Sequence, residues 1–213
     1  MRHLFAIAFV AATVALPYQS AAQDNNRRFA PLRADQLTPQ QKAWADSIAL
    51  PPRNAKFTNP PYRAYIRSPE LAPKLQALSD TVRWNTSLNE RVNEFAILIT
   101  ARQWSNQYVW AAHYALAVKA SMEPKLAVDL AAGKRPEGMK DDEAVLYDYA
   151  MQLYRDKNVS DAAYDAAVAK FGERGLMDAI AVMGYYGLVC MTQITARAEA
   201  ANNGAPILAA LTR

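Results

Sequence analysis

The chain has 213 residues, 52% apolar and 21% charged, which is enough for one well-buried domain and too apolar for a disordered chain. Its net charge of +4 is spread without a clustered basic run, which argues against a nucleic-acid surface. Glycine is scarce, at 7 residues, and good helix formers abound, so the composition favours an all-α fold.

The N-terminus has the pattern of a secretory signal peptide. A basic start containing Arg2 precedes the apolar run Leu4–Leu16, and small residues beyond it offer a cleavage site after Ala22. The alternative is a membrane anchor, but a run of about 13 residues is shorter than the ~20 that span a bilayer. We therefore predict that residues 1–22 are removed, that the mature protein starts at Gln23 with no stable membrane insertion, and that it is periplasmic or secreted.

The domain that we predict over residues 38–205 follows a polar lead-in, residues 23–37. Its first helix begins with Thr38 as N-cap, Pro39 at the first helical position and Gln41 at the capping-box position. This helix is expected to run to about residue 50, where two prolines stop it.

A loop rich in proline and asparagine follows, through residue 61. Ser68-Pro69-Glu70 repeats the cap-and-proline signal, so a second helix is predicted from there to about residue 84. Two further helices are predicted over residues 88–104 and 106–120. Only a residue or two separates them, so we expect a central antiparallel hairpin.

Three more helices are predicted after the hairpin. The first is short, over residues 124–132, and ends at Gly133. The second is amphipathic and covers residues 141–156. The third is capped by Ser160 and stops at Gly172.

The last helix, residues 173–200, is apolar from Leu176 to Cys190, which predicts the central buried helix of the fold. Gly184 and Gly187 within it indicate close approach by a neighbouring helix. Residues 206–213 are expected to form a C-terminal tail. The sequence has no strand pattern and no internal repeat.

One histidine stands out as a candidate for chemistry. His3 leaves with the signal, so His113 is the only histidine of the mature chain, and histidine exchanges protons near neutral pH. Glu94 lies in an otherwise apolar stretch, where a carboxylate is costly unless it is paired. Both residues also have a structural interpretation, with His113 hydrogen-bonded in the core and Glu94 paired with Arg91 one turn earlier.

Other chemistries lack the residues they need. One histidine and one cysteine cannot supply a zinc site, so no metal is expected. The sequence has no serine triad, glycine-rich phosphate loop or dinucleotide fingerprint, and we predict no cofactor. Cys190 has no partner for an internal disulfide, and its apolar neighbours Val189 and Met191 predict a buried, inert thiol.

Several spaced motifs over residues 31–198 resemble the carboxymuconolactone decarboxylase-like family. They are Ser68-Pro69-Glu70-Leu71-Ala72, Leu75-Gln76-Ala77-Leu78, Arg83 to Leu88, Glu94 to His113, Asp142-Glu143-Ala144, Val159-Ser160-Asp161-Ala162 and Gly184-Tyr185-Tyr186. The resemblance implies the AhpD-like all-α bundle, assembled as a homo-oligomer, either a trimer or a hexamer.

The resemblance also separates two branches of the family. In the peroxidase branch a glutamate and a histidine flank a Cys-x-x-Cys pair, and Glu94 and His113 match those outer positions. Asn106 and Val109 stand at the two cysteine positions, so this chain is similar to the non-redox branch. That branch often reads Gln-Tyr-Glu-Trp-Ala-Ala-His-Glu, and here Val109 and Tyr114 replace its two acids.

We predict cofactor-free acid–base chemistry, namely decarboxylation by a carbon–carbon lyase, isomerisation or lactone opening, on a small carboxylated or lactone compound of aromatic origin. His113 would shuttle the proton, and Glu94 would orient the imidazole or deliver protons itself. The first turn of the second hairpin helix favours a substrate carboxylate, aromatic side chains supply the walls, and an arginine pairs with Glu94 or the substrate. The expected substrate-binding residues are Asn106, Gln107, Tyr108, Trp110, Arg102 and Trp104.

Two other functions stay open at this point. The first is a non-catalytic periplasmic binding protein that holds a small aromatic acid in the same pocket, and the replacement of both family acids favours it. The second is thiol peroxidase activity, which the missing cysteine pair argues against.

Overall fold

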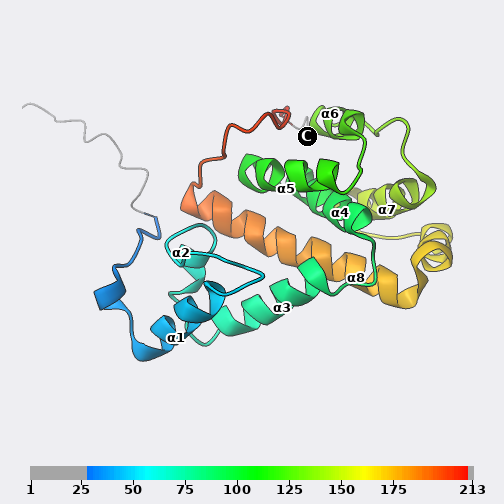
Figure 1. The fold of residues 1–213 in the computed structure, drawn as a ribbon. Helices are drawn as coiled ribbons and strands as arrows, with labels where there is room; N and C mark the ends of the chain where they lie inside the picture. The colour runs from blue at the N-terminus through cyan, green and yellow to red at the C-terminus, as the bar shows by residue number, and fades with distance from the viewer. Residues whose placement is uncertain (1–27, 211–213) are drawn as a thin grey trace, which may run out of the picture.

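The computed structural model describes residues 28–210, and all regular elements within that range are helices (Figure 1). The all-α prediction is therefore confirmed for this part of the chain. The elements are η2 (Ala34–Gln36), α1 (Pro39–Ile48), α2 (Tyr62–Tyr65), α3 (Ala72–Trp84), α4 (Glu90–Gln103), α5 (Gln107–Lys119), α6 (Pro124–Ala131), α7 (Asp141–Met151), η3 (Gln152–Asp156) and α8 (Asp161–Ala196). The predicted signal peptide and its cleavage site lie outside the described residues, so export stays a prediction.

Local capping fixes the start of the first helix where the sequence predicts it. The Thr38 side chain accepts a hydrogen bond from the Gln41 N–H, and the Gln41 side chain accepts one from the Thr38 N–H at 2.9 Å. These bonds satisfy donors that a helix otherwise leaves free. The helix ends at Ile48, ahead of the two prolines.

The predicted start of the second long helix is wrong by several residues. The chain forms a turn after Ser68, whose carbonyl accepts from the Leu71 N–H at 3.0 Å, and α3 begins only at Ala72. Pro73 explains the difference, because a proline is tolerated in the first turn of a helix and breaks its interior. The loop before it also contains α2, a short helix that the sequence analysis did not predict.

The long helix α8 lies at the centre of the molecule, as predicted. In Figure 1 it runs between α3 on one side and α4, α5 and α7 on the other, and it packs against all four. Its backbone breaks at Gly172, which has φ +68°, at the predicted stop. Its most apolar window is long enough to cross a membrane, but 56% of that window is buried inside the fold, which fits a core helix.

The two glycines in α8 differ in their surroundings. A Cβ atom at Gly187 would lie 3.4 Å from Nε1 of Trp104, so the predicted close approach is confirmed there. At Gly184 nothing lies within 4 Å of such an atom, so the prediction is wrong at that position.

The last described residues fold back on the bundle. Asn203 donates to the Ala111 carbonyl at 2.9 Å, and the Ala209 N–H donates to the Ala131 carbonyl at 3.0 Å. The segment that the sequence analysis treated as a tail beyond the domain is thus tied, up to residue 210, to α5 and α6.

Candidate functional site

The structure brings Glu94 of α4 and His113 of α5 together. Oε2 of Glu94 lies 2.7 Å from Nδ1 of His113, and both side chains are less than one-tenth exposed. The two residues lie on helices that are joined by residues 104–106 and that pack against each other. Arg91 is not the partner of Glu94, because it forms ion pairs with Asp142 and Glu143 instead.

This contact orients the imidazole. An ionised carboxylate only accepts hydrogen bonds, so beside it Nδ1 is the donor, and in the neutral imidazole Nε2 then keeps its lone pair. Nε2 has no hydrogen-bond partner within residues 28–210. The edge of the ring packs against Tyr186 with ring centroids 4.8 Å apart, which holds the imidazole in place.

His113 opens onto a pocket of about 170 Å³, called here the His113 pocket. It is enclosed by α5, α8, α3 and the loop that leads into α2. The lining residues are Arg53, Pro60, Pro61, Tyr62, Ser79, Arg83, Tyr108, Val109, Ala112, His113, Tyr185, Tyr186, Val189 and Gln193. Burial raises the pKa of Tyr185 and of Tyr186, so both hydroxyls stay protonated at neutral pH.

Glu94 opens onto a second pocket of about 390 Å³, formed by the end of α3, the following loop and α4. Arg83 lines both pockets. The Glu94–His113 pair therefore lies between two pockets, since His113 lines one and Glu94 lines the other.

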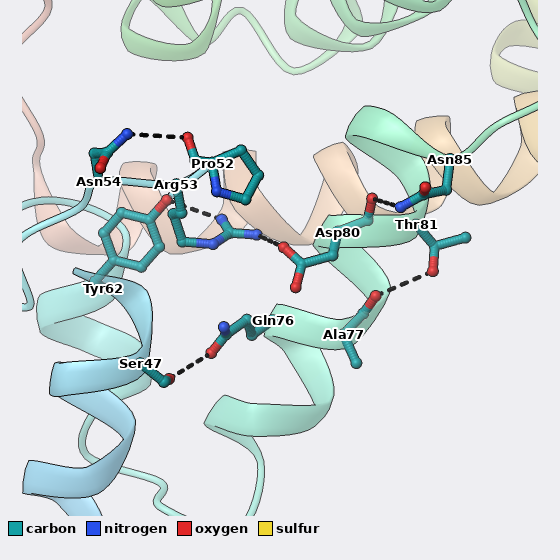
Figure 2. A network of polar contacts seen from close by, with 10 residues as sticks. All are labelled: Ser47, Pro52, Arg53, Asn54, Tyr62, Gln76, Ala77, Asp80, Thr81 and Asn85. Atoms are coloured by element: carbon teal, nitrogen blue, oxygen red, sulfur yellow. Dashed lines mark hydrogen bonds and ion pairs between the residues drawn. The ribbon is translucent and has the colours of Figure 1, made fainter. Parts of the chain in front are cut away.

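Two arginines of the His113 pocket differ in availability. Figure 2 shows Arg53 between Asp80, with which it forms an ion pair, and the Tyr62 hydroxyl, to which it donates at 3.1 Å. Arg83 has no ion pair or hydrogen bond to any residue in 28–210, and its guanidinium lies 5.3 Å from the centroid of the Trp84 ring. Arg53 thus braces the wall of the pocket, whereas Arg83 is the cation available to a ligand.

Two predicted binding residues serve the fold instead. Asn106 caps α5, since its Oδ1 accepts from the Val109 N–H at 2.9 Å and its Nδ2 donates to the Cys190 carbonyl at 3.1 Å. The Gln107 side chain donates to the Pro206 carbonyl at 3.2 Å and accepts from the Leu208 N–H at 2.9 Å. Neither residue lines the His113 pocket, so the structure does not support the expected anion site at the start of α5.

Three other predicted residues also lie away from the pocket. Arg102 is 1% exposed, donates to the Ala209 carbonyl at 2.8 Å, and lies two helical turns from Glu94, about 12 Å along α4. It therefore does not pair with Glu94. Trp110 is fully buried in the core, and Trp104 packs near Gly187.

Of the residues expected to bind substrate, Tyr108 alone lines the His113 pocket. Its hydroxyl donates to the Pro60 carbonyl at 3.3 Å, and burial raises its pKa. The sequence analysis missed Arg83 and Gln193 as pocket residues. Arg83 stands in one of the motif stretches, but no local signal in α3 or α8 indicates that either side chain reaches His113.

Cys190 is expected to be inert towards thiol reagents in the folded protein. Its side chain is fully buried, and burial raises the pKa of the thiol to about 12, so almost no thiolate forms at pH 8. A colorimetric disulfide reagent should therefore release one equivalent of dye only after denaturation. Rapid reaction in buffer, or sustained peroxide consumption that Cys190→Ala abolishes, would contradict this prediction.

Among the described residues, no group of three or more histidine, cysteine, aspartate or glutamate side chains could hold a metal ion. Comparisons of the chain with protein-family models, with curated proteins and with solved structures find no match.

Proposed function

We propose that this protein is a cofactor-free acid–base enzyme that acts on a small carboxylated compound in the His113 pocket. The observation that carries the proposal is the buried Glu94–His113 pair, whose histidine lines a pocket and uses only Nδ1 in the contact with Glu94. A base oriented by a second group, with its other nitrogen open to the substrate, is the arrangement that proton transfer requires.

The pair supports two related reactions. In a decarboxylation, the carbon–carbon bond to the carboxyl group breaks, carbon dioxide leaves, and protonated Nε2 delivers a proton to the carbon that keeps the electron pair. In an isomerisation, neutral Nε2 removes a proton from one carbon and returns it to another. The carboxylate of Glu94 stabilises the imidazolium in both cases and does not itself contact the substrate.

The pocket limits the size and charge of the substrate. Its volume of about 170 Å³ is close to that of an engineered cavity of ~150 Å³ that holds benzene, so a molecule with one ring fits. The rings of Tyr108, Tyr185 and Tyr186 offer flat walls. The guanidinium of Arg83, which has no acidic partner in the described residues, suits a carboxylate.

The second candidate is a binding protein that holds the same acid without converting it. Val109 favours it, because an apolar side chain lines the pocket close to His113 where a second acid would aid proton transfer. Incubation of the purified protein with a panel of small carboxylic acids and lactones, followed by NMR, separates the two. An enzyme yields a product, whereas a binding protein gives line broadening alone.

Glu94→Gln is expected to change which ring nitrogen of His113 carries the proton and to lower turnover about tenfold or more. A carboxylate accepts only and selects the Nδ1–H form, whereas an amide both donates and accepts and selects neither form. Long-range nitrogen–proton NMR spectra of the His113 ring should change from one tautomer to a mixture. An unchanged spectrum would show that the two side chains are not coupled, and the mechanistic role of Glu94 would be lost.

A further inference from the structure

Gln193 has a buried polar side chain that contributes no hydrogen bond to the described part of the fold. It is 1% exposed, and neither Oε1 nor Nε2 has a hydrogen-bond partner in the described residues. Other buried amides are satisfied: Asn93 donates to the Val82 carbonyl, and Asn106 uses both of its polar atoms. A buried amide without partners is costly, so this side chain calls for a partner that the described residues do not supply.

The position of Gln193 shows where that partner belongs. Gln193 lines the His113 pocket, and on α8 it follows Tyr186, which packs on His113, by two helical turns, or about 10.5 Å. The Asn106–Cys190 hydrogen bond lies between these two levels and joins α5 to α8. The polar lining of the pocket therefore includes His113 from α5 and Gln193 from α8.

The chemistry of an amide narrows the group that fits. A carboxamide presents a donor and an acceptor side by side, so a carboxylate, which only accepts, would satisfy Nε2 and leave Oε1 without a partner. A hydroxyl group both donates and accepts, and it satisfies both atoms.

We infer that Gln193 binds a hydroxyl group of the substrate, so that the pocket selects one-ring hydroxy acids over the same acids without the hydroxyl. This inference rests on the proposed function, in which the substrate carboxylate lies near Arg83 and His113. It adds a specificity-determining residue on α8 that lines the same pocket.

A matched pair of ligands tests the inference by equilibrium binding. Isothermal titration calorimetry of the wild-type protein should show that 4-hydroxybenzoate binds about 10–100-fold more tightly than benzoate, since the amide finds its partner only in the first complex. Gln193→Met, with an unbranched apolar side chain of similar length, should bind both acids with equal affinity. Gln193→Asn, which keeps the amide and shortens its reach, should lose most of the preference as a second test.

The outcomes are distinct. Equal affinity of the wild-type protein for both acids, binding of neither, or a preserved preference in folded Gln193→Met would overturn the inference. Arg83→Met should weaken the binding of both acids equally and leave the preference for 4-hydroxybenzoate intact. This result distinguishes the contact with the carboxylate from the contact with the hydroxyl. The proposed function fails on a different result, because it requires turnover, whereas the preference is read from binding alone.

Discussion

Replacing His113 by glutamine is expected to reduce kcat by ~10²–10⁴-fold, the usual contribution of a general acid or base, with little change in substrate affinity. Glutamine keeps a hydrogen-bonding side chain beside Glu94 and Tyr186 but cannot carry a proton to or from a substrate near neutral pH. His113→Ala should be about as inactive. Single-turnover kinetics with the substrate found by the NMR screen measures the effect, and binding titrations establish that the pocket is intact.

Tyr108→Phe is the matched control for this experiment. It removes a hydroxyl from the same pocket, and with it the hydrogen bond to the Pro60 carbonyl, without touching the Glu94–His113 pair. An equal loss of kcat in Tyr108→Phe would trace the effect to disturbed packing. If His113→Gln lowers stability and leaves turnover and binding unchanged, His113 is a core residue and the proposed mechanism is wrong.

Arg91→Leu is expected to lower the free energy of unfolding by about 3–5 kcal/mol, because it leaves a buried carboxylate without its cation. Nη1 of Arg91 lies 2.5 Å from Oε1 of Glu143, whose side chain is 1% exposed, and Nη2 lies 2.7 Å from Oδ2 of Asp142. This cluster joins α4 to the first turn of α7. Urea denaturation of both proteins at neutral pH measures the difference.

The Arg91–Asp142 ion pair predicts how the destabilisation by Arg91→Leu changes with pH. Burial is the largest single influence on the Asp142 carboxyl and opposes its ionisation, but the hydrogen bond and the charge of Arg91, together with hydrogen bonds from Asn89 and the Glu143 N–H, outweigh it and lower the pKa of Asp142. A carboxyl group with a lowered pKa stabilises the fold above its unfolded pKa of about 3.9 and loses that contribution as the pH falls. The difference between wild type and Arg91→Leu should therefore narrow below about pH 4.

Arg135→Leu is the control for a surface ion pair. Arg135 and Asp148 are more than half exposed, so the loss of this pair should cost 0–1 kcal/mol. If Arg91→Leu lowers the free energy of unfolding by less than about 1 kcal/mol, as the control does, the buried cluster stabilises the fold no more than a surface ion pair.

The sequence determined the features whose causes lie within one or two helical turns. The capping box of Thr38 and Gln41 and the glycine stop at Gly172 are read from adjacent residues, because a helix end needs partners for its own free backbone groups. The Glu94–His113 contact joins residues 19 apart in the chain, and it could be expected because only residues 104–106 separate the two helices that carry them.

Only the tertiary structure decided which side chains share the pocket. Arg83 comes from α3 and Gln193 from α8, and nothing near either residue in the sequence indicates that they meet His113. The same holds for Arg102 and Gln107, which looked like ligand-binding residues and instead hold the C-terminal segment. A hydrogen-bonding side chain takes whichever partner the packing of the helices brings within about 3 Å, and that partner can be a hundred residues away.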